Sequence, residues 1–213
     1  MNDGLNLPKS AYVNKFIAKS KFYEKVALNS KLQKEFTDNI QRITWKYKLA
    51  EETIGISKTD TVTEIQIFEI SLKEQVIPKN VLKIIDKTIP YQILYRFVHI
   101  ESIAYGITLK ENTKAENYYF SDWNEALAFD FSGISLEKVY QKLIKIFIRS
   151  EAGNKSDFKE LIATDNRIKT LENEIKLLGS KINKEKQFNR KVEKNKILLE
   201  KKAQLEKIKE DVK

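Results

Sequence analysis

Residues 63–75, TEIQIFEISLKEQ, decide the fold that the sequence predicts. In an extended strand, Ile65 and Ile67 fall on one face, whereas Phe68, Ile70 and Leu72 fall on the other. Apolar side chains on both faces are typical of a strand in the middle of a sheet that is covered on both sides. We therefore expect this segment to be a central strand with a layer of structure packed on each face.

The segments that follow predict a helix and then a sheet. Residues 77–90, IPKNVLKIIDKTIP, begin and end near a proline, as a short helix does. The runs 91–100, 102–110 and 116–123 are aromatic and β-branched with short polar connections, which indicates an antiparallel meander. Residues 135–148 predict a closing helix, with Ser135 as its N-cap and one apolar stripe.

Upstream of the central strand, residues 29–43 carry another helical pattern. Leu32, Phe36, Ile40 and Ile43 recur at spacings of four, four and three, and Asn29 or Ser30 can serve as the N-cap. Together these elements predict an α+β fold over residues 1–150, with a mixed, mainly antiparallel sheet and flanking helices. All nine tyrosines and both tryptophans lie in this part.

The remainder of the chain has the pattern of a coiled coil. We expect a linker over residues 151–159, and a coiled-coil helix or helical hairpin over residues 160–213. The apolar seam steps by three and four residues and resumes near the end; its members are Ile168, Leu171, Ile175, Leu178, Ile182, Leu205, Ile208 and Val212. Such a seam must be buried, and a homodimer through this region is the expected arrangement.

Residues 184–196, KEKQFNRKVEKNK, interrupt that seam. The heptad predicts apolar side chains at Glu185 and Asn189, whereas Phe188 lies out of phase. The helix must unwind locally, fold back, or meet another surface here. One continuous helix of about 50 residues, roughly 75 Å long, also fits the pattern.

The composition narrows the classes of function. The chain has no cysteine and a single histidine, His99, which excludes disulfides, thiol catalysis and cysteine- or histidine-rich metal sites. We therefore expect no metal and no cofactor. No apolar run approaches the roughly 18 residues of a membrane span, and the start MNDGLNLPKSAYVNKF lacks the apolar core of a secretory signal. We expect a cytoplasmic protein that does not bind membranes.

The charge of the chain favours anionic partners. Lys and Arg number 39 against 30 Asp and Glu, a formal net charge of +9. Basic residues concentrate in two stretches, Lys9 to Lys48 and Lys181 to Lys202. A lysine-rich composition of this kind also arises from an AT-rich genome without selection for binding.

The second basic stretch holds the main candidate contact site for nucleic acid or a protein partner. Arg190 can make a bidentate contact with phosphate, and Phe188 can stack on a base or insert into a partner. The full set is Lys184, Lys186, Phe188, Asn189, Arg190, Lys191 and Lys194. The alternative is a solvated face of a coiled coil, whose lysines balance nearby glutamates.

An alternative catalytic site involves Glu64, Glu69 and Lys73 around the central strand. Carboxylates and a lysine on neighbouring strand positions are typical of restriction-type nucleases, in which the carboxylates bind Mg²⁺. The spacing here lacks the compact acid-x-lysine unit, and no preceding strand supplies a metal-binding aspartate. An ion pair between Glu69 and Lys73 is the simpler expectation.

Four segments in order resemble a bacterial family catalogued only as a domain of unknown function, numbered forty-three ninety-one. They are LNLPKSAYVNKFIAKSKFYEK (5–25), TEIQIFEISLK (63–73), KIIDKTIPYQILY (83–95) and KEKQFNRKVEKNK (184–196), so the similarity spans nearly the whole chain. The resemblance implies a small protein often encoded beside helicases and DNA methyltransferases, on mobile or defence-type loci. It implies no catalytic residues.

The expected function is therefore a non-catalytic adaptor of a bacterial DNA-processing or phage-defence system. Its partner would be a helicase or DNA methyltransferase, with nucleic acid contacted through the basic patches. A divergent Mg²⁺-dependent nuclease and a purely structural coiled-coil oligomer remain as alternatives.

Overall fold

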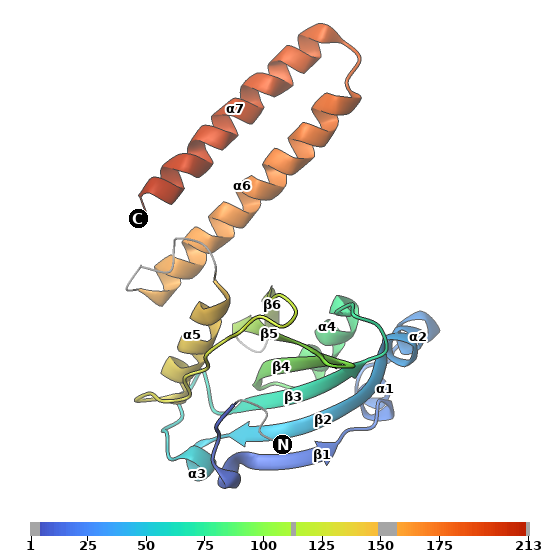
Figure 1. Cartoon of the computed structure of the whole chain (residues 1–213), viewed down its shortest axis with the longest axis vertical. Coiled ribbons are helices and arrows are strands. Elements are labelled where there is room, and N and C mark those ends of the chain that lie inside the picture. Colours follow the sequence, from blue (N-terminus) through green and yellow to red (C-terminus); the bar gives the residue numbers. More distant parts are fainter. Residues whose placement is uncertain (1–4, 112–113, 149–156, 212–213) are drawn as a thin grey trace. The chain divides into compact units, whose positions relative to one another are not determined.

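A computed structural model describes residues 5–111, 114–148 and 157–211 of the chain. The chain divides into two compact units, Met1–Phe147 and Ile148–Lys213. The first unit is an α+β sheet domain, and the second is a pair of long helices (Figure 1). We call them the sheet unit and the hairpin.

The sheet unit is built on six strands in the order β1-β2-β3-β4-β5-β6. Neighbouring strands are antiparallel except for β3 and β4, which run parallel and are joined by helix α4 (Lys79–Thr88). The strands are β1 (Tyr12–Phe16), β2 (Ile40–Leu49), β3 (Ile65–Leu72), β4 (Gln92–His99), β5 (Ser102–Glu111) and β6 (Lys114–Phe120). The predicted α+β class and the antiparallel meander of the last three strands are confirmed.

The predicted central strand is β3, which lies between β2 and β4 and is covered on both faces. Phe68, Ile70 and Leu72 pack with side chains of helices α2 (Ser30–Asn39) and α4 in one core. By strand alternation, Ile65 and Ile67 point to the opposite face, and both are fully buried. Burial on both sides explains why the segment is apolar on both faces.

Helix α5 (Leu136–Phe147) packs against β5 and β6 and buries the apolar stripe that the sequence predicts. Its N-cap is Ser135, whose hydroxyl accepts a hydrogen bond from the backbone N–H of Lys138. Three short helical segments complete the unit: η1 (Lys9–Ala11), α1 (Ser20–Lys25) and α3 (Glu51–Ile54). Within the described residues, no helix of either unit is long and apolar enough to span a membrane.

The helix predicted over residues 29–43 is too long. Asn29 caps α2 by accepting a hydrogen bond from the N–H of Leu32, as expected, but the helix ends at Asn39. Ile40 and Ile43 belong to β2, where Ile43 lies opposite Ile70 of β3. Their spacing fits a helix, but pairing with the central strand satisfies their backbone groups and buries both side chains completely. Strands β1 and β2 were not predicted.

The hairpin consists of α6 (Phe158–Lys184) and α7 (Phe188–Glu210), which run antiparallel (Figure 1). Asp157 caps α6 by accepting a hydrogen bond from the N–H of Lys159. Ile168, Leu171 and Leu205 form the buried centre of the seam, with Ile175 and Ile208 packed against it. Of the alternatives that the sequence left open, the chain folds back at 185–187 and does not form one continuous helix of about 50 residues. Residues 151–156 of the expected linker, and Val212, lie outside the described residues.

Candidate functional site

The turn of the hairpin is organised by Glu185, which follows the last residue of α6. Its Oε1 atom accepts hydrogen bonds from the backbone N–H groups of Lys186 and Gln187, at 3.1 and 3.2 Å. Its Oε2 atom forms an ion pair with the ammonium group of Lys194 on α7. The hydrogen bond from Lys194, followed by that from Gln187, lowers the pKa of Glu185. A polar residue at this seam position is thus explained by its role in the turn.

Four cations surround this turn, and all are exposed. Lys184 ends α6, Lys186 lies in the turn, and Arg190 and Lys191 lie in the first turn of α7. We call these four residues and Phe188 the hairpin tip. Across the described ranges, none of the four has an acidic side chain within ion-pair distance, whereas Lys194 is paired with Glu185.

Cations on the stem of the hairpin are arranged differently. Lys201 pairs with Glu174 at 2.7 Å, and Lys209 with Glu172 at 3.6 Å, so these ion pairs connect α7 to α6. Some lysines of the stem are therefore neutralised by glutamates of the facing helix. The four cations of the tip are not, so they leave a local excess of positive charge. Lys196, Lys202 and Lys207 of the stem also have no acidic partner among the described residues, so what distinguishes the tip is that four such cations lie at one turn.

Phe188 lies between Lys186 and Arg190 in the chain, and 77% of its surface is exposed. It is the first residue of α7, and Val192 lies one turn further along the same face of the helix with 51% exposed. Because most of this side chain stays in contact with water, it contributes little burial free energy to folding. Together with Val192 it forms an exposed apolar patch rimmed by polar residues, the kind of surface that is a candidate contact site.

The start of α7 adds to the positive potential at the tip. Its N-cap, Gln187, makes no side-chain capping bond, and its first turn contains no acidic residue. The free N–H groups and the helix dipole there favour an anion. Asn189, also exposed in this turn, supplies an amide that can donate to phosphate or to a base.

The three residues of the alternative nuclease site are not brought together. Glu64 precedes β3 and is buried; its carboxylate accepts a hydrogen bond from Gln66 at 2.6 Å and lies 3.4 Å from Lys48 Nζ. Glu64 and Glu69 are five residues apart on an extended segment, which puts them on opposite faces and roughly 16 Å apart. Among the residues that the structure describes, no group of three or more His, Cys, Asp or Glu could hold a metal ion.

The predicted ion pair between Glu69 and Lys73 is wrong. Glu69 Oε2 lies 2.5 Å from Arg96 Nη1 and 3.7 Å from Lys46 Nζ. Register is the reason, because Arg96 of β4 lies directly opposite Glu69 of β3. Lys73 follows the end of β3, is exposed, and donates its backbone N–H to the carbonyl of Asn39.

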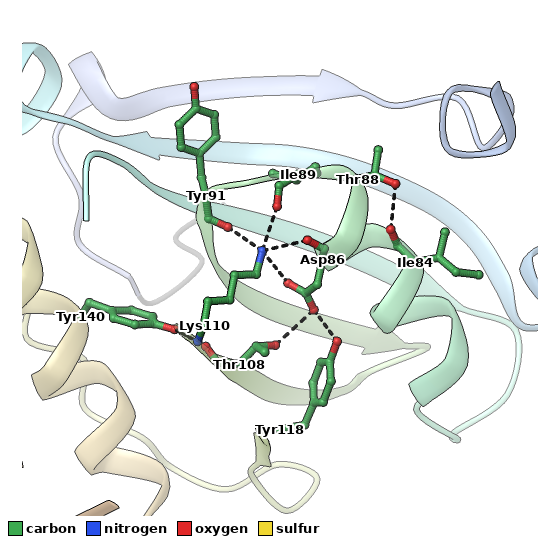
Figure 2. Close-up of polar contacts among 9 residues, drawn as sticks. All are labelled: Ile84, Asp86, Thr88, Ile89, Tyr91, Thr108, Lys110, Tyr118 and Tyr140. Atoms are coloured by element: carbon green, nitrogen blue, oxygen red, sulfur yellow. Dashed lines mark hydrogen bonds and ion pairs between the residues drawn. The ribbon is translucent and has the colours of Figure 1, made fainter. Parts of the chain in front are cut away.

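A buried ion pair in the sheet unit was missed by sequence analysis (Figure 2). Lys110 of β5 and Asp86 of α4 are fully buried, with 2.9 Å between Nζ and Oδ1. The ammonium group also donates to the carbonyl oxygens of Asp86, Ile89 and Tyr91, at 3.3, 2.9 and 2.6 Å. Because α4 ends at Thr88, Lys110 neutralises the negative end of that helix.

Hydroxyl groups complete the network around Asp86. Its Oδ2 atom accepts hydrogen bonds from Tyr118 at 2.6 Å and Thr108 at 3.2 Å (Figure 2). Burial lowers the pKa of Lys110, which the charge of Asp86 opposes, and burial raises the pKa of Tyr118. Both charged side chains are 0% exposed, so the pair joins α4 to the sheet and is closed to a substrate. No spacing in the sequence signals it, since the two residues are 24 positions apart.

These observations define a two-unit protein in which an α+β sheet domain is followed by an antiparallel helical hairpin with a basic, aromatic tip. The chain belongs to a family described as Domain of unknown function (DUF4391), whose model matches residues 5–205. The match spans both units, so the hairpin is part of the family's architecture. No curated protein and no solved structure matches the chain.

Proposed function

We propose that this protein is a non-catalytic adaptor of a bacterial DNA-processing or phage-defence system, and that its hairpin tip binds nucleic acid. One observation carries the proposal: four exposed cations, which have no acidic partner among the described residues, lie within four positions of the exposed Phe188 in the chain. Cations of this kind contact phosphates and release counterions, while an aromatic ring stacks on an unpaired base or inserts between bases.

The position of the tip supports this role. The turn is fixed by the contacts of Glu185 with two backbone N–H groups and with Lys194, so the cations are presented on an ordered structure. The start of α7 contributes N–H groups to the same end. Binding there needs little ordering of the protein backbone, which lowers its entropic cost.

The adaptor part of the proposal draws on the resemblance to a family found beside helicases and DNA methyltransferases. The divergent nuclease is the weaker candidate, since Glu64 and Glu69 lie on opposite faces of a strand and are both paired with cations. We place the adaptor in the cytoplasm, where such partners act.

Charge substitution at the tip tests nucleic-acid binding. We expect the double variant Arg190→Gln/Lys191→Gln to bind duplex DNA roughly tenfold or more weakly at 0.1 M salt, with the slope of log K against log salt reduced by about 1.8. Fluorescence anisotropy across a salt series measures both quantities.

The matched control is Lys202→Gln/Lys207→Gln. These lysines are also exposed on α7, and Lys202 lies about 18 Å from Arg190 along the helix axis. The control removes the same charge, so it should retain most of the affinity. Equal losses in the two double variants would show a general charge effect and overturn the assignment to the tip.

The protein partner is tested by purification from the native host with nuclease treatment. Recovery of a helicase or methyltransferase that survives the nuclease, and its loss in Phe188→Ala, would place protein binding rather than nucleic-acid binding at the tip. Recovery of partners only without nuclease would support bridging through nucleic acid.

We also propose a homodimer through the hairpin, as a coiled coil that uses the apolar side chains left exposed on α7. Val192 and Leu199 lie within about 20° of one another around the helix, and each is more than half exposed. Sedimentation of the full chain should give a dimer that Val192→Glu/Leu199→Glu converts to a monomer. A monomeric wild-type chain would contradict this part of the proposal.

A further inference from the structure

A hollow at the edge of the sheet unit has features of a second binding site. Its lining includes Phe16 of β1, Gln41 and Arg42 of β2, and Ser71 of β3. It lies on the face of the sheet that also carries Glu69, since Phe16 is opposite Thr44 and Thr44 is opposite Glu69. None of these residues belongs to the hairpin.

An irregularity in β2 creates this hollow. The register between β2 and β3 shifts between Ile40 and Arg42, so that Gln41 is the extra residue of a bulge. Bulges redirect side chains and are frequent beside binding sites. Both Gln41 and Arg42 are exposed as a result, in a strand whose next residue, Ile43, is fully buried.

The aromatic element of the hollow is Phe16, which is 55% exposed on the edge strand. The guanidinium group of Arg42 lies over its ring, 5.5 Å from the centroid. Tyr12, further along β1, is 50% exposed and contacts Tyr47 edge to face, with 5.4 Å between centroids. Exposed aromatic rings on a sheet are the surface on which single-stranded nucleic acids stack their bases.

The electrostatic element is an excess of cations near the hollow. Lys19 donates a hydrogen bond to the carbonyl of Ile40, at the start of β2, and its pKa is lowered by burial and by the nearby charge of Lys73. Within the described part of the chain, Lys19, Lys73 and Arg42 have no acidic partner at ion-pair distance. The ammonium group of Lys19 lies at the carbonyl of Ile40 and the backbone N–H of Lys73 at that of the adjacent Asn39, so both lysines lie beside the start of β2, where an excess of positive charge favours an anion.

Glu69, an acid on this face, does not neutralise that excess. Glu69 is two residues before Ser71 on β3, but Arg96 and Lys46 already share its carboxylate. The two cations exceed the single charge of Glu69, so the sheet face next to the hollow remains positive.

We propose that this hollow binds single-stranded nucleic acid, with a base stacked on Phe16 and the neighbouring phosphates bound by Arg42, Lys19 and Lys73. A single strand is favoured over a duplex because Phe16 can reach the face of a base only when that base is unpaired. This is a second site, separate from the hairpin tip, and evidence for or against binding at the tip does not decide whether it exists.

Photocrosslinking tests the location directly. A halogenated-uracil oligonucleotide irradiated with the full-length protein should crosslink to the peptide that contains Phe16, identified by mass spectrometry. The crosslink should persist in Arg190→Gln/Lys191→Gln, the variant that tests the hairpin tip. Failure to crosslink at or near Phe16 would overturn the proposal whatever the tip does.

Affinity measurements supply the second test. We expect Phe16→Ala to weaken binding of a labelled oligothymidylate roughly five- to hundredfold, the range for loss of one stacked base. Arg42→Gln should weaken it as well and reduce the salt slope by about 0.7. Both side chains are exposed, so thermal unfolding should be unchanged and serves as the folding control.

The matched control for Arg42 is Arg42→Lys, which keeps the charge but loses the planar group above Phe16; it should retain the salt slope and lose part of the affinity. Wild-type affinity in both Phe16→Ala and Arg42→Gln would overturn the proposal. Equal losses for single-stranded and duplex DNA would overturn the single-strand assignment.

Discussion

The sheet unit holds an ion pair in its interior, whereas the cations of the hairpin tip are exposed to solvent. Lys110 and Asp86 are fully buried, and Glu69 lies between Arg96 and Lys46. By contrast, Lys184, Lys186, Arg190 and Lys191 are exposed around an exposed phenylalanine. A buried pair connects elements of a fold, while unpaired charge at the surface remains available to a ligand. The paired charges of the first region join elements of the fold, and the exposed cations of the second are those that we propose bind nucleic acid.

The two regions also differ in how much core they possess. The sheet unit buries aromatic and aliphatic side chains on both faces of a six-stranded sheet. The hairpin buries a narrow seam centred on Leu171 and Leu205. We expect the hairpin to be the less stable unit, so changes of pH and single substitutions should affect the two units separately.

The largest expected effect is the loss of the sheet unit at high pH. Burial raises the pKa of Tyr95, Tyr118 and Tyr140 above the ordinary value of 10.0. A raised pKa in the folded state gives stability that is present below pH 10.0 and is lost as the pH rises further. Lys110 has the opposite sign: because its pKa is lowered in the folded state, its contribution to stability rises with pH and is complete above the ordinary value of 10.5.

The hairpin contains no tyrosine, so its helices should persist when the sheet unit unfolds at alkaline pH. Tyrosinate absorbance followed together with circular dichroism measures the transition. The buried tyrosines should ionise, and so raise the tyrosinate absorbance, over the same pH range in which the circular dichroism signal of the sheet is lost. Full ionisation of all nine tyrosines with the sheet intact would contradict the prediction.

The substitution Lys110→Met should cost about 3–5 kcal/mol of unfolding free energy, because it leaves the carboxylate of Asp86 buried without its cation. Urea denaturation measures the change. The matched control is Lys142→Met, which breaks the exposed pair with Asp130 and should change stability little. Equal losses of stability in the two variants would contradict the prediction that the buried pair contributes more than the exposed one.

In the hairpin, Leu171→Ala should cost about 2–5 kcal/mol locally, since it opens a cavity in the centre of the seam. Hydrogen exchange should show faster exchange in α6 and α7, with the amides of β3 and β4 still protected. Leu177→Ala is the control, because Leu177 is largely exposed. Simultaneous loss of protection in both units would show that they unfold as one.

Two glycines give the smallest contrast. A Cβ atom on Gly106 of β5 would lie 2.7 Å from the ring of Phe120, so Gly106→Ala should destabilise the sheet unit by about 1–3 kcal/mol. A Cβ atom on Gly179 of α6 would meet open space, so Gly179→Ala should stabilise the hairpin by about 0.5–1 kcal/mol. Thermal unfolding measures both, and the same sign in both variants would contradict the difference in packing.

The spacing of apolar residues predicted those helices and strands in which the apolar positions are also the buried ones. The central strand β3, helix α4 and helix α5 follow from their apolar positions, and the interruption at Glu185 follows from the seam. The pattern failed at Ile40 and Ile43, where one spacing fits both a helix face and a strand that pairs with β3. Only the presence of that neighbouring strand selects the second structure.

The candidate contacts divide in the same way. Phe188 and Arg190 were candidates from the sequence because they lie where the apolar seam is interrupted. Phe16 and Arg42 lie 26 positions apart, and only the antiparallel pairing of β1 with β2 brings the cation over the ring. The sequence signals residues that disturb a local period, but it does not signal contacts that depend on strand register.

By itself, the sequence determined an α+β domain with a central strand, a basic helical region with an interrupted seam, and the absence of cysteine chemistry. Those features depend on composition and on periods of two and 3.6 residues, which are local properties of the chain. The tertiary structure alone decided that α6 and α7 form a hairpin, that Arg96 pairs with Glu69, and that Lys110 reaches Asp86. These contacts join residues distant in sequence, and they form because burial requires each charge and each backbone group to find a partner.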